Sequence, residues 1–123
     1  MKHSKQFLAI VGEAKSRIQE TTVDDVRADL ADGVPFHLVD TREDSEWDAG
    51  HAKGAIHLGK GVIERDIVGR IPEGRAKLVL YCAGGYRSAL AADALGRMGY
   101  RNVYSLAGGW RAWKAAGMPV ERG

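Results

Sequence analysis

The stretch Lys77-Leu78-Val79-Leu80-Tyr81-Cys82 gives the strongest strand pattern in the chain. It is apolar almost throughout, which is typical of a strand that is covered on both faces. Shorter extended runs are expected at Phe36–Asp40, Ala55–Leu58 and Val103–Leu106. Because helical patterns separate these runs, the sequence predicts an α/β fold with a mostly parallel central sheet and helices on both faces. Ligands of such sheets bind beyond the carboxyl ends of the strands, which is where Cys82 lies.

Helical spacing of apolar residues predicts the elements between these strands. An N-terminal amphipathic helix is expected from about Ser4 to Arg17, with one apolar face made of Phe7, Ile10, Val11, Ala14 and Ile18. Further helices are expected at residues 23–31, 87–99 and 109–116. In the segment 87–99, the predicted apolar face consists of Leu90, Ala91, Ala94, Leu95 and Met98.

The composition is that of a single globular domain. The 123 residues include 18 basic and 16 acidic side chains, which are interspersed and leave a net charge of +2. No basic run stands out, so we expect no nucleic-acid partner. About six apolar residues precede Glu13, fewer than the roughly 7–15 of a secretory signal. We therefore expect a cytoplasmic protein that makes no membrane contact.

One cysteine, Cys82, excludes a disulfide within the chain and every zinc pattern built on several cysteines. The histidines show no metal-ligand spacing; they are His3, His37, His51 and His57. The sequence therefore predicts neither a metal nor another cofactor.

The segment after the strand reads Cys82-Ala83-Gly84-Gly85-Tyr86-Arg87-Ser88 and then continues as a helix. A lone cysteine is commonly a small buried apolar residue. Here two glycines let the backbone curl so that its N–H groups form an anion-binding nest. The helix N-terminus adds partial positive charge, and Arg87 adds a full charge. These groups favour the thiolate, which is the nucleophilic form of cysteine.

The loop Cys82–Ser88 resembles the active-site loop of rhodanese-type sulfurtransferases, in which four residues separate a cysteine from an arginine. Two further segments resemble the family, and together the matches cover about Thr21 to Val120. The earlier segment contains Asp40-Thr41-Arg42, Glu46-Trp47, Gly50-His51 and Gly54-Ala55. The later one contains Leu106-Ala107-Gly108-Gly109, Trp113, Gly117 and Pro119-Val120.

This resemblance implies a single rhodanese-like domain at residues 21–123, with residues 1–20 as a helical extension. It implies a sulfurtransferase in which Cys82 is catalytic and residues 83–88 bind the substrate and the persulfide. The donor would be thiosulfate or a persulfide, and the acceptor a thiol or cyanide. The N-terminal helix lies outside the match and is a candidate docking face for a second copy or another protein.

Several further residues are candidates for supporting roles. Asp40 and Arg42 are expected to form a structural ion pair or a loop-bracing hydrogen bond at the edge where Cys82 lies, with a direct catalytic role as the alternative. Thiosulfate-preferring members of the family often carry a basic residue directly after the cysteine, where this chain has Ala83. We therefore expect weak thiosulfate binding, with Lys60 and Arg65 as candidates for the missing charge.

Smaller roles are expected for three other residues. Ser88 is expected chiefly to cap its helix and also to offer its hydroxyl to the pocket. Tyr86 is expected to face outward and shape access to the site, and His51 to be structural.

Two other functions stay open at this point. A phosphatase or arsenate reductase also places a cysteine and an arginine at a helix start, but its loop has one more residue between them. The shorter loop here favours a single extra sulfur atom over a tetrahedral oxyanion. A non-catalytic module that carries or senses sulfur is the second alternative, although Cys82 and Arg87 are both present.

Overall fold

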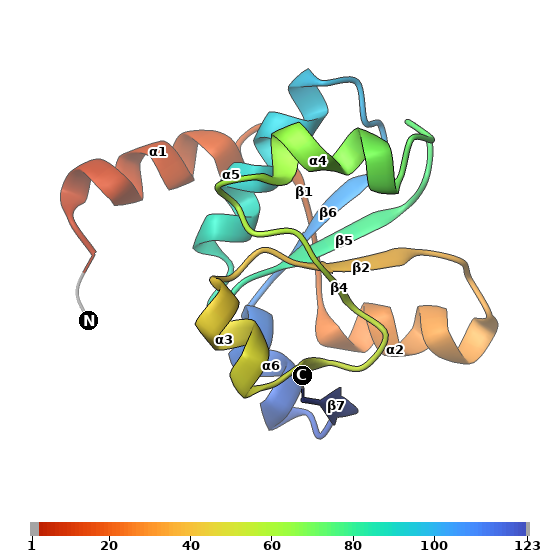
Figure 1. Cartoon of the computed structure of the whole chain (residues 1–123). Helices are drawn as coiled ribbons and strands as arrows, with labels where there is room; N and C mark the ends of the chain where they lie inside the picture. The colour runs from red at the N-terminus through yellow and green to blue at the C-terminus, as the bar shows by residue number, and fades with distance from the viewer. Residues whose placement is uncertain (1–2, 123) are drawn as a thin grey trace.

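A five-stranded parallel sheet forms the centre of the computed structural model, which describes residues 3–122 (Figure 1). The strand order is β1-β6-β5-β2-β4, and every neighbouring pair is parallel. The strands span Gln19–Thr21 (β1), His37–Asp40 (β2), Ile56–His57 (β4), Leu78–Tyr81 (β5) and Val103–Leu106 (β6). Two short strands, His51–Ala52 (β3) and Val120–Glu121 (β7), pair separately and antiparallel. The predicted mostly parallel sheet is confirmed.

Helices cover both faces of this sheet, as the sequence predicts (Figure 1). They span Lys5–Lys15 (α1), Val23–Asp32 (α2), Asp44–Ala49 (α3), Ile63–Arg70 (α4), Tyr86–Arg97 (α5) and Gly109–Ala115 (α6). Helices α4 and α5 cover one face and α2 and α6 the other. Side chains of β5 alternate between the two resulting cores, with Leu78 and Leu80 in one and Val79 and Tyr81 in the other. This is why the β5 sequence is apolar at every position.

The structure adds elements that the sequence patterns did not predict: β1, β3, β7, α3 and α4. Helix α3 has no buried residue, and it begins with a capping box between Glu43 and Glu46 rather than with an apolar stripe. Strand β1 crosses the boundary between residues 20 and 21 that separates the expected extension from the domain.

The apolar face predicted for residues 87–99 is partly wrong. Met98 is exposed, whereas Ala91, Ala92 and Leu95 pack into the core. The helix is covered by the sheet on one side and by α1 on another, so more than one stripe of it is buried.

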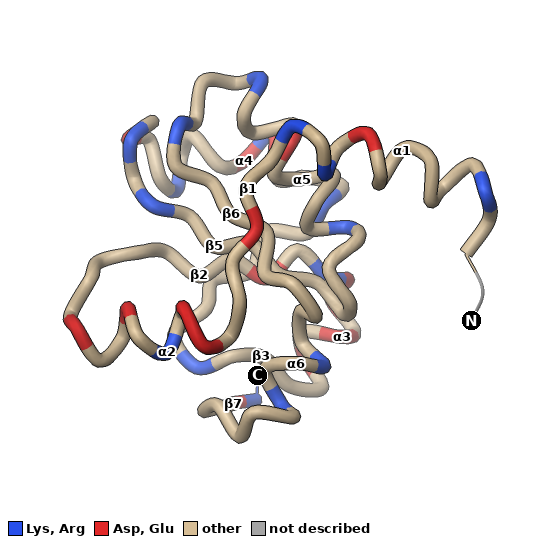
Figure 2. The backbone as a smooth tube through the Cα atoms, turned by 180° about the vertical axis from the view of Figure 1, so that it is seen from behind, with Lys and Arg blue, Asp and Glu red and all other residues tan. Residues whose placement is uncertain are grey.

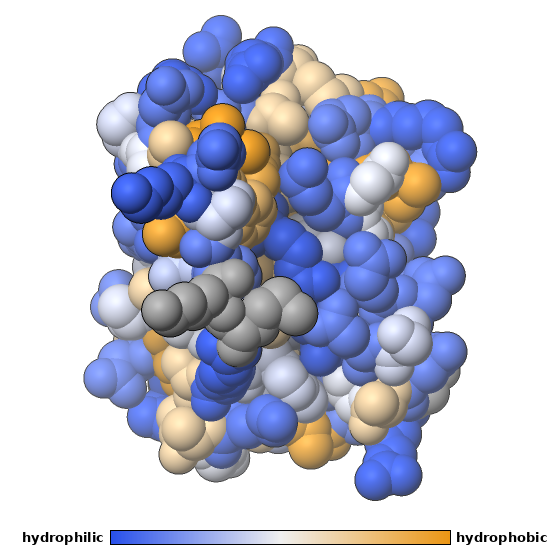
Figure 3. Space-filling view, turned by 90° about the vertical axis from the view of Figure 1, so that its left-hand side faces the viewer, coloured by the Kyte–Doolittle hydropathy of each residue, from blue (hydrophilic) through white to orange (hydrophobic). Residues whose placement is uncertain are grey.

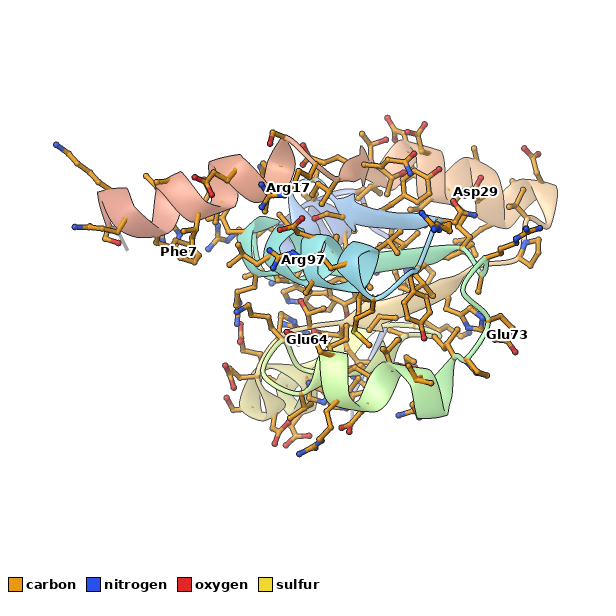
Figure 4. All side chains as sticks on the ribbon, turned by 90° about the horizontal axis from the view of Figure 1, so that it is seen from above. Phe7, Arg17, Asp29, Glu64, Glu73 and Arg97 are labelled. Carbon is orange, nitrogen blue, oxygen red and sulfur yellow. The ribbon has the colours of Figure 1, made fainter. Side chains whose placement is uncertain are left out.

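Helix α1 runs along α5 and extends past it (Figure 1). It buries Val11 and Ala14, whereas Ile10 of the predicted apolar face is exposed. Just beyond its C-terminal end, Arg17 pairs with Asp93 of α5, which also pairs with Arg97. Figure 4 shows Arg17 and Arg97 on adjoining segments, seen from above. The helix is therefore held to α5 by apolar packing and by this ionic cluster.

The surface is mixed in character. Basic and acidic residues occur on most elements, and acidic residues gather on α2 (Figure 2). On the side from which α1 projects, apolar patches lie between hydrophilic side chains (Figure 3). No helix within residues 3–122 is long and apolar enough to cross a membrane.

Candidate active site

Cys82 directly follows β5 at the carboxyl edge of the sheet, and its side chain is 1% exposed. Helix α6 supports the backbone of the residues that follow. The Trp110 N–H donates to the Cys82 carbonyl at 2.7 Å, and the Arg111 N–H donates to the Ala83 carbonyl at 3.2 Å. Gly109 has a φ of +52°, and a Cβ at this position would overlap the Cys82 carbonyl oxygen. Only glycine therefore lets α6 approach the loop this closely.

The sulfur atom of Cys82 lies within hydrogen-bonding distance of two donors. The Gly85 N–H donates to Sγ at 3.1 Å, and the Ser88 hydroxyl donates to it at 3.6 Å. The Ser88 hydroxyl also lies 2.8 Å from that of Ser105 on β6. If the Ser105 hydroxyl donates to the Ser88 oxygen, the Ser88 hydroxyl hydrogen is directed at Sγ. The two hydroxyls then form a hydrogen-bond chain that ends at the sulfur.

The cradle lowers the pKa of Cys82 despite its burial. Burial alone raises the pKa of this thiol, because a buried charge loses hydration. The hydroxyl of Ser88 and the amide of Gly85, together with the nearby backbone amides of Ser88 and Gly84, more than offset that effect. The net pKa lies below the ordinary value, which increases the thiolate fraction at neutral pH.

Arg87 does not supply the unpaired charge that the sequence suggested. Its guanidinium makes two hydrogen bonds to Glu46 of α3, at 2.8 and 3.1 Å. This pairing lowers the pKa of Glu46 and raises that of Arg87. Arg87 still attracts a charged Cys82, but Glu46 neutralises much of its charge.

Asp40 and Arg42 form the structural ion pair expected from the sequence. Both side chains are buried, and the Arg42 Nη2 lies 2.7 Å from an Asp40 carboxylate oxygen. The same nitrogen donates to the Gly50 carbonyl at 2.7 Å, and the guanidinium lies 4.7 Å from the centre of the Trp110 ring. The pair therefore joins the end of β2 to α6, the helix whose amides hydrogen-bond to the backbone of the cysteine loop.

The proposed supporting cations, Lys60 and Arg65, lie away from the sulfur cradle. Arg65 is exposed and bonds to its neighbour Asp66. Lys60 is exposed and borders a cavity of about 410 Å³ whose lining residues all lie outside residues 82–88. The structure thus gives neither side chain a contact with the cysteine loop.

One expectation about the start of α5 is wrong, and the structure adds contacts to the residue named in another. Ser88 does not cap the helix, because Gly85, with a φ of +102°, occupies the N-cap position. Tyr86 is partly exposed, and its ring also lies against those of His3 and Phe7, with centroids 4.9 and 6.2 Å away. The N-terminal segment therefore contacts a residue of the cysteine loop.

His51 has the structural role expected of it. Its ring stacks on Trp47 at 3.5 Å, and its Nδ1 lies 3.2 Å from the Trp47 carbonyl. Within residues 3–122, no group of three or more His, Cys, Asp or Glu side chains is placed to hold a metal ion.

Sequence reasoning missed Ser105, Glu46 as the partner of Arg87, and Arg111. Ser105 carried a weak signal, since it is a hydroxyl in an otherwise apolar buried strand. Glu46 and Arg111 belong to α3 and α6, and only the folded chain brings these helices to the cysteine loop.

Comparison with a family model and with curated proteins identifies the same family of proteins. A model of the rhodanese-like domain matches residues 22–116. The chain is 34% identical over 85 residues to the thiosulfate sulfurtransferase GlpE of Vibrio cholerae, covering 69% of this chain and 78% of that protein. It is 32% identical over 113 residues to the probable adenylyltransferase/sulfurtransferase MoeZ of Mycobacterium tuberculosis, covering 89% of this chain but only 29% of that protein.

Among solved structures, one similar fold belongs to a Rhodopseudomonas palustris protein of unknown function, described as a possible tyrosine phosphatase. The two chains are 32% identical, with a TM-score of 0.84 and 98% of each chain covered.

Proposed function

The chain belongs to the rhodanese-like domain family, and from that premise we propose that it is a sulfurtransferase that carries sulfur on Cys82. The observation that supports this most directly is the cradle around Sγ, formed by the Gly85 amide and the Ser88 hydroxyl. These donors stabilise the thiolate before the reaction and a terminal sulfur anion after it. The similarity to a thiosulfate sulfurtransferase agrees with this chemistry.

The reaction proceeds in two displacements. The Cys82 thiolate attacks the outer sulfur of the donor, so that a bond forms between Sγ and that sulfur. The donor's own sulfur bond breaks, and its electron pair leaves with the remaining fragment, which is sulfite when the donor is thiosulfate. A thiol or cyanide acceptor then attacks the terminal sulfur, and Cys82 leaves as the thiolate. No metal or cofactor is required for either step.

Phosphatase activity is the second candidate, because a similar structure belongs to a possible tyrosine phosphatase. The cradle argues against it in this chain. Four residues separate Cys82 from Arg87, and the Arg87 guanidinium bonds to Glu46. In this arrangement the arginine is not free to bind a phosphate above the sulfur.

Intact-protein mass spectrometry tests the proposal directly. Exposure to thiosulfate should add the mass of one sulfur atom, and subsequent cyanide should remove it. Cys82→Ser should show no addition and no turnover while keeping the circular dichroism spectrum of the wild type. A wild type that hydrolyses p-nitrophenyl phosphate but gains no sulfur would favour the phosphatase instead.

A non-catalytic sulfur-carrier role would give a different result in the same experiment. Cys82 would accept sulfur, but cyanide or a small thiol would not remove it at a useful rate. The exposed Leu8 and Ile10 on α1 would then be candidates for contact with an acceptor protein or with a second copy. Size-exclusion chromatography of Leu8→Lys beside the wild type would detect self-association through this helix.

A further inference from the structure

The positive charges around the cysteine loop are mostly matched by carboxylates. Arg87 pairs with Glu46, and Arg42 pairs with Asp40. Arg111 on α6 differs, because no carboxylate within residues 3–122 lies at ion-pair distance from it. Among the described residues no carboxylate therefore neutralises its guanidinium, whose donors can bind another partner.

Two contacts place Arg111 beside the residues that follow Cys82. Its backbone N–H donates to the Ala83 carbonyl at 3.2 Å. A Cβ built on Gly84 would lie 3.3 Å from its Nη1 atom, so the guanidinium occupies the space that a side chain at position 84 would need. Both ends of Arg111 thus lie against the loop, and the side chain as a whole is exposed.

We propose that Arg111 binds the oxyanion end of the sulfur donor and makes this site selective for donors whose leaving group carries sulfonate-type oxygens. The proposal rests on the sulfurtransferase function proposed above. The sulfur that is transferred must approach Sγ, which is buried in its cradle, so the rest of the donor stays at the rim of the loop. The rim is where the Arg111 guanidinium lies.

The chemistry of the step explains why a cation at the rim matters. When the sulfur–sulfur bond of thiosulfate breaks, the electron pair leaves with sulfite, and negative charge builds up on the oxygens. A guanidinium offers parallel N–H donors that match two such oxygens at once. Arg111 would thereby supply, from α6, the charge that Ala83 does not supply from the loop itself.

The test compares two donors in Arg111 variants. Thiosulfate brings two charges and an oxyanion leaving group, whereas an alkyl persulfide releases a thiolate without oxygens. Arg111→Ala should raise the KM for thiosulfate by about two- to fivefold, the range of an exposed charge contact. It should leave the KM for the alkyl persulfide and the rate of iodoacetamide alkylation of Cys82 nearly unchanged.

Two controls make the result specific. Arg111→Lys keeps the charge but loses the forked donors, so its KM for thiosulfate should fall between those of wild type and Arg111→Ala. Arg101→Ala removes the same charge near the amino end of β6, away from the loop, and should behave as wild type. The effect of Arg111→Ala should also shrink as salt rises, because the guanidinium is open to solvent.

The outcomes separate this proposal from the function on which it rests. An unchanged KM for thiosulfate, or an equal loss with both donors, overturns the role of Arg111 and leaves the sulfurtransferase intact. A wild type that takes sulfur from neither donor overturns both.

Discussion

Two arginine–carboxylate pairs lie at the edge of the sheet where Cys82 is found, and both are bidentate. In the Asp40–Arg42 pair, the arginine and carboxylate side chains are 3% and 0% exposed. In the Glu46–Arg87 pair, the corresponding values are 28% and 33%. The chemistry of the two pairs is the same, so what differs is how far water reaches them.

This difference assigns the pairs different roles. A buried pair cannot lose one partner without leaving an unmatched charge in the interior, so it fixes the geometry around it. A partly exposed pair contributes little to stability, because water competes for both charges. The Asp40–Arg42 pair therefore holds in place α6, the helix that supports the cysteine loop. The Glu46–Arg87 pair determines how strongly the charge of Arg87 stabilises a Cys82 thiolate.

The largest expected effect comes from breaking the buried pair. Asp40→Asn preserves the shape of the side chain but leaves Arg42 charged and unmatched. The free energy of unfolding should fall by about 3–5 kcal/mol. Urea denaturation measures the loss, and Glu46→Gln, which should cost no more than about 1 kcal/mol, serves as the matched control. Equal losses in the two variants would show that burial does not separate the pairs.

A smaller effect is expected on the sulfur when a direct donor is removed. Ser88→Ala deletes a hydroxyl that bonds to Sγ, so the pKa of Cys82 should rise and the thiolate fraction at neutral pH should fall. Alkylation by iodoacetamide at pH 7 should slow roughly fivefold, the effect of about one hydrogen bond. Arg87→Ala should slow it less, because Glu46 already offsets the charge of Arg87. The reverse order would mean that Arg87 acts on the sulfur more strongly than its pairing suggests.

Freeing Arg87 should change reactivity in the opposite direction. Glu46→Gln removes the carboxylate that neutralises Arg87, so the attraction between Arg87 and a Cys82 thiolate is no longer offset. The pKa of Cys82 should fall further, and alkylation below pH 7 should speed up by about twofold. The double variant Glu46→Gln with Arg87→Gln should lose this gain.

The smallest effect concerns acid stability. The hydrogen bond from Arg87 lowers the pKa of Glu46 below its ordinary value of 4.5. The stability gained from this pair is therefore fully present above about pH 4.5 and is lost as the pH falls through the lowered pKa of the folded state. The difference in unfolding free energy between wild type and Arg87→Gln, below about 1 kcal/mol at neutral pH, should vanish at lower pH. A difference that persists to strongly acidic pH would mean that the pair is not its source.

The sequence predicts best what local pattern determines. The apolar run of β5 and the cysteine–glycine loop after it are both continuous in the chain, so the parallel sheet and the position of Cys82 could be read from them. The charge balance around the sulfur could not be predicted from local pattern. Glu46 and Arg87 are 41 residues apart, and Ser88 and Ser105 are 17 apart.

The expectation that Lys60 or Arg65 supplies positive charge to the site has no support in the structure. Lys60 and Arg65 were candidates because they follow an expected strand, but Arg65 bonds to the adjacent Asp66. Arg111 stands between Trp110 and Trp113 in a segment whose pattern predicts only a helix. Its contact with Ala83 depends on the close approach of α6, which Gly109 makes possible.

The attachment of α1 to α5 has a consequence for hydrogen exchange. The amides that lower the pKa of Cys82 belong to Gly84, Gly85 and Ser88, and Tyr86 between them is packed against His3 and Phe7. At the other end, Arg17 joins α1 to Asp93. Opening of the first turn of α5 must disturb the ring contacts, so α1 and this turn should exchange their amide protons as one cooperative unit. The lifetime of the sulfur cradle is thus set in part by a helix that contributes no atom to it.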